Sequence, residues 1–422
     1  MRALHTVRVA IASALLLAAC EGKIVGPNGN GGDDDDGGTT IDASTEIDAP
    51  GPPPIPADCL EAANRGLAWL VQQQNADGSW GQSVKMATTG FAVLKIETYA
   101  WEIGQSAFSD AFIYKPQLMA GLNFLFRNAQ LVPIRAQTHG NPDTNGNGMG
   151  IQWSGLVYED AIDTMAIAAG AEPTQVVNEP GSPLNGKTFM EVVQDAADFM
   201  FFSQADATSS GGGSCNRGGW RYSPFDNNPA VGDNSVTQWA TLALEYARHP
   251  QYRFQIPTPD WVNVELRDWV DCIQNHAGGQ TDGAAGYTGP NEILNAYKTG
   301  AVIQQMSFLG DNPNGPNVAA AVNFLGRVWD DTSGVGWKRN GTSDYLAMYS
   351  IMKGMESMAI TDIGAVNWYR QFCDQLKAEQ LPNGAWPASQ WERDNTGAGA
   401  LNSTEWALLV LERAAPPPEI IN

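Results

Sequence analysis

The sequence predicts an all-α fold, an α6/α6 toroid in which six helical hairpins close into two concentric rings of helices. Three observations predict it. A Trp or Tyr follows a Gly-rich turn six times, a stretch with helical spacing of apolar residues precedes each turn, and a second helical stretch follows it. Units of this kind bury their apolar faces only against their neighbours, so twelve helices in a closed ring account for residues 58–415 as one domain.

The six turns divide this domain into six units. Their aromatic residues are Trp80, Trp153, Trp220, Tyr287, Trp337 and Trp386. Small polar residues of the kind that cap helices open the second helix of each unit; these are Thr88 with Thr89, Asp160 with Asp163, residues 233–235, Asn291, residues 342–344 and residues 402–404. The third and sixth units agree most closely, because residues 237–242 read TQWATL and residues 404–409 read TEWALL.

The second helix of each unit is expected in the inner ring. Residues 165–171, 240–247 and 407–411 are nearly free of charge, as helices covered on most sides by protein must be. The first helices carry a charged face, as Arg267 and Asp268 illustrate, and are expected outside.

Residues 1–20 are predicted to be an export signal. Arg2 and Arg8 supply positive charge, residues 9–19 form an apolar stretch too short to span a membrane, and the segment ends Leu-Ala-Ala-Cys20. This ending resembles the bacterial lipobox, which implies a lipoprotein with acyl chains such as palmitate at Cys20. Glu21 implies the outer rather than the inner membrane. A plain secretory signal with an incidental Cys is the alternative.

The segments before and after the domain are predicted to be a tether and a tail. Residues 21–57 are rich in Gly, Asn, Asp and Pro and are predicted to be a disordered tether. Four consecutive acids, residues 33–36, have no hydrophobic framework around them, so we interpret them as solvated linker rather than a metal motif. Residues 416–422 form a short C-terminal tail.

The negative net charge of the chain limits which molecules are expected to bind it. The formal net charge is −22, from 24 basic and 46 acidic residues. Nucleic acid and an anionic bilayer surface are therefore not expected as main partners, because like charges repel. We expect a monomer that needs no cofactor and no metal.

Two segments carry a family resemblance. Residues 72–81, QQQNADGSWG, resemble the QW motif of the prenyltransferase and squalene-cyclase repeat families. Residues 218–224, GGWRYSP, followed by residues 233–237, DNSVT, are similar to a segment of bacterial envelope proteins with those repeats. The resemblance covers most of residues 58–415 and implies an α/α toroid. It leaves function open, because this fold serves terpenoid cyclases, protein prenyltransferases, thioester-containing domains and non-catalytic binders.

The best-known reactions of these families are not expected here. Residues 160–164, DAIDT, stand where a terpenoid cyclase carries Asp-x-Asp-Asp-Thr, but Ile162 replaces the acid that delivers the proton. None of the four histidines lies in the inner-helix context of a prenyltransferase zinc site, and the thioester sequence Cys-Gly-Glu-Gln is absent.

Polar residues at the heads of the inner helices are expected to converge on one mouth of the ring. Asp163, Asp233, Asp344 and Glu405 are the candidate catalytic acids, because glycan hydrolysis needs paired carboxyl groups, one with a raised pKa. Candidate ligand-binding residues at the same mouth are Asp160, Thr237, Gln238, Glu292 and Tyr345, with Tyr297 and Tyr349 as further members. N-capping is the competing interpretation of each acid, and Asn402 with Glu405 has the spacing of a capping box.

Arg221 and Tyr222, with Arg217, lie beside the Gly-rich stretch 209–214 and are also candidate ligand-binding residues, because long loops often carry function. A flexible surface insertion is the alternative. The tryptophans of the turns could form a platform for sugar rings, but we expect them to pack over the turns and tie helices together. The remaining tryptophans are assigned to the core.

Four cysteines besides Cys20 are expected to form disulfides in an oxidising envelope compartment. Four thiols allow three pairings. Units three and four are neighbours, as are units six and one in a closed ring, so we predict Cys215–Cys272 and Cys59–Cys373, the second of which locks the ring.

These observations support three hypotheses about function. The first is a membrane-anchored lipoprotein whose toroid binds a small molecule, a glycan or a protein without an assigned reaction. The second is a glycan hydrolase or lyase that uses the acids of the mouth. The third is an isoprenoid-processing enzyme with a non-standard acid, which requires an aromatic, mostly apolar cavity. What lines the central cavity distinguishes them.

Overall fold

The structure is a computed structural model that describes residues 54–205, 215–224, 231–395 and 399–416. The predicted signal with Cys20, residues 21–53 of the tether, the stretch 209–214 and residues 417–422 of the tail lie outside the described residues. In the described ranges, no helix is long and apolar enough to cross a membrane.

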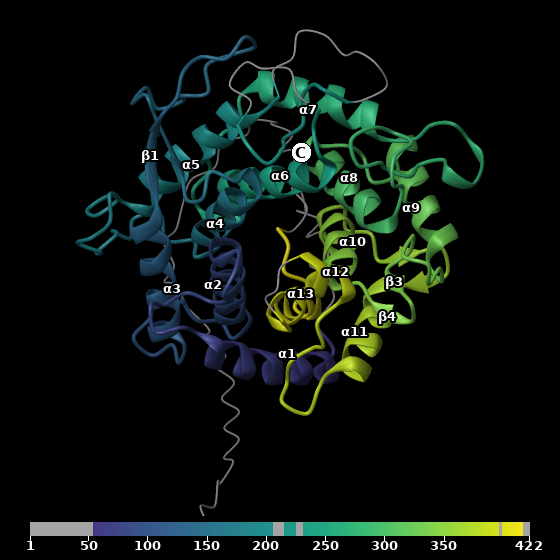
Figure 1. The fold of residues 1–422 in the computed structure, drawn as a ribbon, viewed down its shortest axis with the longest axis horizontal. Helices are drawn as coiled ribbons and strands as arrows, with labels where there is room; N and C mark the ends of the chain where they lie inside the picture. Colours follow the sequence, from purple (N-terminus) through teal and green to yellow (C-terminus); the bar gives the residue numbers. More distant parts are fainter. Residues whose placement is uncertain (1–53, 206–214, 225–230, 396–398, 417–422) are drawn as a thin grey trace, which may run out of the picture. The chain divides into compact units, whose positions relative to one another are not determined.

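Six helices form an inner ring, which Figure 1 shows in a view down the shortest axis of the molecule. They are α2 (Lys85–Glu102), α4 (Val157–Ala169), α6 (Asn234–Arg248), α8 (Ala296–Phe308), α10 (Tyr345–Ser357) and α13 (Leu401–Leu411). Each packs against the next, and α13 packs against α2, so the ring is closed. The inner helices are buried along nearly their whole length, as their low charge predicts.

Six helices form the outer ring. They are α1 (Ala57–Leu70), α3 (Lys115–Asn128), α5 (Phe189–Ser203), α7 (Asp260–Ile273), α9 (Pro316–Val328) and α11 (Trp368–Glu379). Outer and inner helices alternate along the chain, which confirms the α6/α6 toroid. A further short helix, α12 (Gln390–Asn395), precedes α13.

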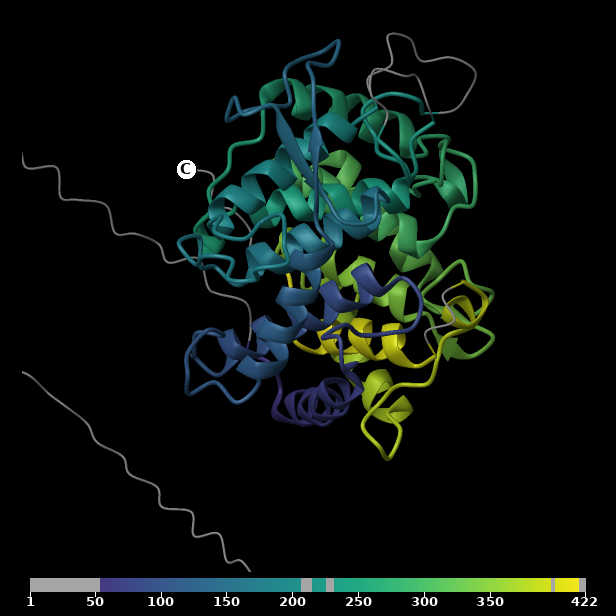
Figure 2. The same cartoon turned by 60° about the vertical axis from the view of Figure 1, so that its left-hand side comes forward.

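The remaining regular elements are short. Antiparallel hairpins join β1 (Gln130–Pro133) to β2 (Met149–Gln152), β3 (Lys338–Arg339) to β4 (Thr342–Ser343), and β5 (Asp362–Ile363) to β6 (Val366–Asn367). The β1–β2 hairpin contacts α5 on the outside of the ring, as the turned view of Figure 2 helps to follow. Three 3₁₀ turns, Val71–Gln73, Pro250–Tyr252 and Gly279–Thr281, complete the described elements.

In three units the tryptophan of the turn ties the outer helix to the inner helix that follows. The indole N–H of Trp80 donates to the carbonyl of Leu70 at 2.9 Å, and its backbone N–H donates to Oγ1 of Thr89 at 3.0 Å. The turns at Trp220 and Trp386 repeat both bonds; their partners are Met200 and Thr237, and Leu376 and Thr404. These three tryptophans therefore have the structural role expected from the sequence.

A glutamine at the end of an outer helix repeats in four units and connects neighbouring outer helices. Its side-chain amide donates to the carbonyl of a turn glycine and to a carbonyl in the next outer helix. The glutamine, turn glycine and next-helix residue are Gln74, Gly78 and Gln117; Gln204, Gly218 and Val262; Gln274, Gly283 and Asn317; and Gln380, Gly384 and Ala62. The fourth set joins α11 to α1 and so closes the ring.

Four inner helices begin at positions other than expected. Helix α4 begins at Val157, so Asp160 and Asp163, which were expected to open it, lie inside it. Helix α2 begins at Lys85, so Thr88 and Thr89 lie inside its first turns and bind the turn instead of capping the helix. Helix α8 begins at Ala296 and is capped by Asn295, not Asn291, whose side chain accepts a hydrogen bond from Asn275 instead. Helix α13 begins at Leu401, so Asn402 and Glu405 are internal and form no capping box.

The end of the ring opposite the helix heads is filled by buried polar groups. Lys95 of α2 pairs with Glu412 after α13, and Lys353 of α10 donates to the hydroxyl of Tyr246 on α6 at 2.9 Å. Burial lowers the pKa of Lys353 to about 7. Pro54 lies at this same end, beside Thr361 and Arg413, so the described chain enters the ring opposite the mouth.

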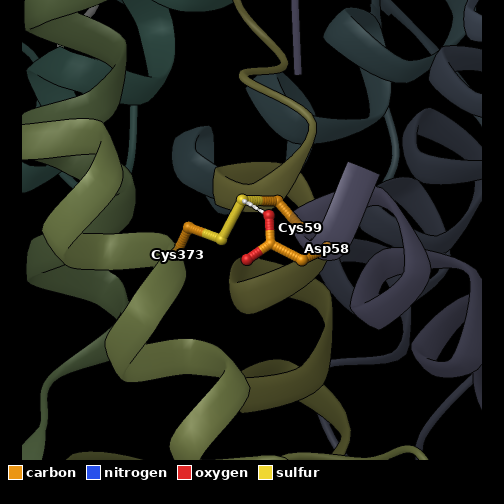
Figure 3. A group of neighbouring side chains, drawn as sticks. All are labelled: Asp58, Cys59 and Cys373. Carbon is orange, nitrogen blue, oxygen red and sulfur yellow. Dashed lines mark hydrogen bonds between the residues drawn. A yellow bond between two sulfur atoms is a disulfide. The ribbon is translucent and has the colours of Figure 1, made fainter. Parts of the chain in front are cut away.

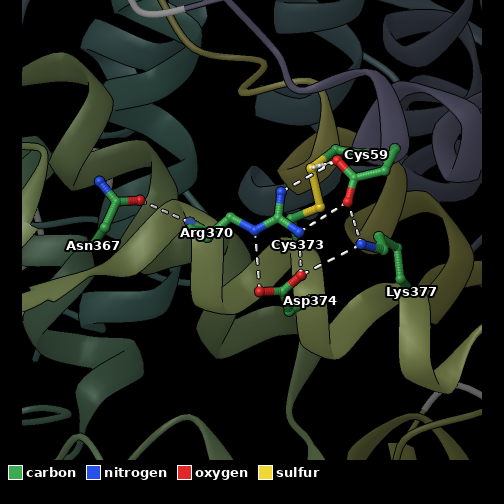
Figure 4. A network of polar contacts seen from close by, with 7 residues as sticks. Cys59, Asn367, Arg370, Cys373, Asp374 and Lys377 are labelled. Carbon is green, nitrogen blue, oxygen red and sulfur yellow. Dashed lines mark hydrogen bonds and ion pairs between the residues drawn. A yellow bond between two sulfur atoms is a disulfide. The ribbon is translucent and has the colours of Figure 1, made fainter.

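Both predicted disulfides are present. Cys59 of α1 joins Cys373 of α11 (Figure 3), and Cys215 joins Cys272, with Cα atoms 5.7 and 5.8 Å apart. Beside the first bridge, Arg370 and Lys377 of α11 reach across to Asp58 of α1 and also contact Asp374 (Figure 4). The seam between the last and first units therefore has covalent and ionic connections.

Candidate functional site

A cavity of about 210 Å³ opens where the inner helices begin. Every inner helix contributes to its lining, as expected for the mouth of a toroid. The lining residues are Val84, Ala87, Phe91, Tyr158, Ile162, Tyr222, Ser235, Val236, Trp239, Tyr297, Leu346, Asn402 and Trp406. Aromatic and aliphatic side chains dominate, and four lining residues carry a hydroxyl group: Tyr158, Tyr222, Ser235 and Tyr297.

Aromatic rings form the floor of the cavity. The ring of Phe91 stands edge-on to those of Trp239 and Trp406, with centroids 5.4 and 6.4 Å away. Tyr349 of α10 is fully buried and stacks on Trp239 at 5.4 Å. Edge-to-face and offset pairs of this kind are favourable arrangements of aromatic rings, so these rings form one packed cluster under the cavity.

The helical repeat explains why these aromatics face the centre. Thr89, Thr237 and Thr404 each direct the side chain at the preceding turn, where the hydroxyl accepts a backbone N–H. Two residues further on, a helix has rotated by about 200°. The side chains at that position, Phe91, Trp239 and Trp406, therefore point to the opposite side, into the cavity.

Tyrosine hydroxyls form part of the rim. The hydroxyl of Tyr158 donates to Oε1 of Glu159 at 3.1 Å, and the hydroxyls of Tyr222 and Tyr287 are 3.1 Å apart. The rings of Tyr158 and Tyr222 meet edge-on with centroids 6.2 Å apart. Tyr222 is 42% exposed, so a ligand entering the cavity meets it first.

The four candidate catalytic acids lie in the wall behind this lining. Within the described part of the chain, none of Asp163, Asp233, Asp344 and Glu405 is among the lining residues. Asp233 caps α6 by accepting the N–H of Ser235 at 2.9 Å, and Asp344 caps α10 by accepting the N–H of Ala347 at 3.1 Å. The geometry of these two acids is that of N-caps.

Three acids gather at the head of α4. Asp160 accepts the backbone N–H groups of Trp153 and Ser154 at 2.7 and 2.9 Å, and burial raises its pKa to about 7. Asp163 lies against Gly90 of α2, and neither of its oxygens has a hydrogen-bond partner in the described ranges. Burial, with the charges of Asp160 and Glu159, raises the pKa of Asp163 far above its usual range.

Glu405 is held inside α13. Its Oε2 accepts a hydrogen bond from the side chain of Asn402 at 3.1 Å, and burial raises its pKa well above the usual range. The N-terminal N–H groups of α13 are instead satisfied by Glu392 of α12, which accepts from Asn402 at 2.8 Å and Ser403 at 3.1 Å.

Of the seven candidate ligand-binding residues, Tyr222 lines the cavity. Asp160 and Thr237 bind their turns, and Gln238 accepts from Ser350 at 3.1 Å. The other three point elsewhere: Arg221 to the carbonyl of Val231, Glu292 to the hydroxyl of Thr288, and Tyr345 to Glu379 of α11. Tyr297 lines the cavity, while Tyr349 lies beneath its floor.

The residues missed from the sequence are Phe91, Tyr158, Trp239 and Trp406. The last two are among the tryptophans expected in the core. The available signal was the repeat itself, since TQWA, TEWA and residues 89–92, TGFA, place an aromatic side chain two residues after a threonine in three units. Glu159, which is 4% exposed and bonded to a lining tyrosine, was also missed.

Among the described residues, one group of acids and cysteines is close enough to suggest a metal site. It consists of Asp58, Cys59 and Cys373 (Figure 3). Its two sulfur atoms form the ring-closing disulfide, and Asp58 pairs with Arg370 and Lys377. The group therefore fits a structural seam.

No protein-family model and no curated protein matches this chain by sequence. Solved structures share its fold. The GH76A α-1,6-mannanase from Salegentibacter sp. HEL1_6 is similar with a TM-score of 0.51 and 10% identity, over 84% of this chain and 98% of that one. An inactive variant of that mannanase in complex with α-1,6-mannotetrose gives a TM-score of 0.51 and 10% identity, over 85% and 99%. A second inactive variant, with α-1,6-mannotriose, gives 0.50 and 9%, over 84% and 99%. The described domain therefore shares the α/α toroid of these mannanases.

Proposed function

We propose that the protein binds a glycan in the mouth cavity and acts on it as a glycoside hydrolase. The observation that carries the proposal is an aromatic floor, Phe91, Trp239 and Trp406, below a rim of hydroxyl groups. The flat apolar face of a sugar ring fits against such a floor, while a few placed polar groups orient its hydroxyls. Solved mannanases with the same fold bind mannan oligosaccharides, which supports this choice among the fold's functions.

The acids at the head of α4 supply the chemistry for cleavage. Glycoside hydrolysis requires an acid that still holds its proton near neutral pH. Glu159 and Asp160 are consecutive, and burial raises the pKa of both. By analogy, the inactive mannanase variants replace two consecutive aspartates. Glu159 is the better placed of the two here, because its neighbours Tyr158 and Ala87 line the cavity. We assign it the role of proton donor to the leaving oxygen.

Calorimetry and an assay for released reducing ends test this proposal. The full chain is given α-1,6-mannotetraose and a panel of other oligosaccharides. We expect binding and slow release of shorter products. Trp239→Ala should weaken binding at least tenfold, whereas Trp101→Ala, at an exposed site outside the cavity, should not change it. Glu159→Gln should bind normally and cleave about 100-fold more slowly, the range for loss of a general acid.

The outcomes separate binding from cleavage. Binding without products from any glycan would overturn hydrolysis and leave glycan recognition. Absence of binding to the whole panel would overturn both.

A second candidate, an isoprenoid-class ligand, is favoured by one observation: no charged side chain is among the residues that line the described cavity. An apolar chain against aromatic rings suits such a lining, and aromatic faces stabilise carbocations. Titration with farnesol separates the two candidates. Tight farnesol binding that Trp239→Ala abolishes, with no glycan binding, would favour the isoprenoid.

We also propose that a lipid on Cys20 anchors the protein to the outer membrane. The chain enters the described domain opposite the mouth, so an anchored tether would leave the mouth free to meet a glycan. Detergent phase partitioning of the full-length protein against Cys20→Ala tests this. Equal partitioning of the two would contradict it.

A further inference from the structure

The described residues close the mouth cavity on its sides and at its inner end. All six inner helices contribute to its wall, and they pack into a closed ring, so the wall is continuous around the cavity. Below the floor, Tyr349 and Lys353 are fully buried, and Nζ of Lys353 on α10 donates across the ring to the hydroxyl of Tyr246 on α6 at 2.9 Å. A side chain without exposed surface has no water-sized space beside it. The cavity is therefore a blind pocket that opens only at the mouth.

The volume of this pocket suits a single ring of a ligand. It is about 210 Å³. A cavity of roughly 150 Å³ holds one benzene molecule, whereas pockets that enclose drug-sized ligands begin at about 300 Å³. One six-membered sugar ring with its hydroxyl groups lies between these two cases. A second ring of the same glycan would have to stay outside, at the opening.

The lining of the pocket is also uncharged. Among the described residues, none of the side chains that line it carries a charge. An ionised ligand group would lose its hydration there without meeting an opposite charge, which is unfavourable. Ser235, Asn402 and the tyrosine hydroxyls can instead form hydrogen bonds with the hydroxyl groups of a sugar. The lining therefore suits a neutral sugar ring better than a uronic acid or a protonated amino sugar.

The proposed proton donor lies at the opening of this pocket. Tyr158 lines the cavity, and its hydroxyl is 3.1 Å from Oε1 of Glu159. The oxygen that links an enclosed ring to the rest of a glycan has to pass the same opening. The bond closest to Glu159 is then the first bond of the glycan chain. Positive charge develops on the anomeric carbon during cleavage, and aromatic faces stabilise such charge, so the ring on the aromatic floor should be the one whose anomeric carbon reacts.

From this geometry we infer that the pocket takes one uncharged sugar ring from the non-reducing end of a glycan, and that the protein releases sugars one at a time from that end. This inference rests on the proposed function and names the part of the glycan that is recognised. In each cycle the bond between the anomeric carbon of the enclosed ring and the linking oxygen breaks. Glu159 gives its proton to that oxygen, a water molecule supplies a hydroxyl group to the anomeric carbon, and the remaining hydrogen of the water restores the proton on Glu159.

Calorimetric titration of the full chain with mannose-based ligands tests the inference. Lengthening the ligand from α-1,6-mannobiose to α-1,6-mannotetraose should change the affinity less than about twofold, because the added rings lie outside the pocket. A benzylidene acetal on the non-reducing terminal ring of the tetraose adds a phenyl ring that the pocket cannot hold, and should weaken binding about tenfold or more. Reduction of the opposite end to an alditol should leave the affinity unchanged. The first small product from the tetraose should be mannose.

A variant that widens the opening should admit the blocked ligand. Tyr222 lines the pocket, is 42% exposed and meets the ring of Tyr158 edge-on at the rim. Tyr222→Ala should therefore reduce the difference in affinity between the blocked and the free tetraose by about fivefold or more. The matched control is Leu381→Ala, because Leu381 is 39% exposed and is not a lining residue, and it should leave this difference unchanged. Thermal unfolding confirms that both variants fold.

The results separate this inference from the function on which it rests. If the native protein binds no glycan, the proposed function fails and the one-ring pocket with it. If glycans bind but the affinity rises with each added ring, or the blocked tetraose binds as tightly as the free one, glycan recognition stands and the one-ring pocket is overturned. Mannobiose as the first small product would keep hydrolysis and overturn release from the end.

Discussion

Buried carboxyl groups at the heads of the inner helices are the main feature at the scale of single residues. Asp233 and Asp344 are stabilised there as caps, since each accepts backbone N–H groups that the first turn leaves unpaired. Among the described residues Asp163 has no such partner, and burial together with the charges of Asp160 and Glu159 raises its pKa. The wall of the cavity thus contains acids that keep their protons at pH values where exposed acids have lost them.

We predict that Asp160 makes the protein less stable as the pH rises from about 4 to 7. Its folded pKa of about 7 lies above the usual 3.8, so its stabilising effect is complete below pH 4 and lost towards pH 7. At 1.4 kcal/mol per pKa unit, the loss is roughly 4 kcal/mol. Asp160→Asn keeps an oxygen for Trp153 and Ser154 and should flatten this dependence. Urea unfolding at pH 5 and pH 8 measures it.

The matched control is Asp77→Asn. Hydrogen bonds from Ser79 lower the pKa of Asp77 to about 2, so it is ionised at both pH values and its replacement should leave the slope unchanged. Parallel pH profiles for the native protein and Asp160→Asn would contradict the prediction.

The sequence could not predict which side chains of the inner helices point into the cavity. Adjacent helical residues differ by about 100°, so neighbouring side chains of one helix point to the cavity and to the wall, and a misplaced helix start hides which is which. Thr88 and Thr89 were expected to open α2, which begins at Lys85. The same uncertainty concealed Phe91. Tyr222 was found because it lies in a turn, where no helical phase is needed to place it near the mouth.

The connection between units is the main feature at the scale of elements. In four units the turn glycine has a positive φ, and a Cβ there would overlap a backbone carbonyl of the neighbouring outer helix. Gly218 is the tightest example, with Glu265 of α7 as its neighbour. These glycines allow outer helices to approach closely enough for the glutamine side chains to bridge them. The sequence predicted the turns from their glycines, but not that glutamine is the connecting residue.

Gly218→Ala should therefore cost far more stability than a glycine replacement with the same backbone angle in open space. Gly146 provides that comparison, because both residues have φ of 76° and a Cβ at Gly146 meets nothing within 4 Å. We expect Gly146→Ala to lower the free energy of unfolding by about 1 kcal/mol, the cost of the left-handed conformation. Gly218→Ala adds overpacking against α7 and should cost roughly 3 kcal/mol or more. Equal losses in urea unfolding would show that conformation alone matters.

Closure of the ring is the main feature of the whole molecule. The topology of the ring was predictable, because six similar units imply that the last unit packs against the first. The same reasoning predicted both disulfide pairs. Across the seam, Phe91 of α2 faces Trp406 of α13, so ring closure also sets the distance between two rings of the cavity floor. The fold could be predicted from the number of repeats. The site could not, because it depends on which way individual side chains point, and the repeats do not determine that.

The ring-closing disulfide should accordingly contribute more stability than the other bridge. The sequence separation is 314 residues for Cys59–Cys373 and 57 for Cys215–Cys272. Loop-closure entropy grows with the logarithm of that length, so the double variant Cys59→Ala with Cys373→Ala should lose roughly 1.5 kcal/mol more than Cys215→Ala with Cys272→Ala. Urea unfolding of both double variants measures the difference. Because the first bridge closes the ring at the seam where Phe91 of α2 faces Trp406 of α13, we expect only its removal to weaken ligand binding in the cavity. Equal loss of stability and equal binding in the two variants would mean that the ionic seam of Asp58, Arg370 and Lys377 closes the ring without the disulfide.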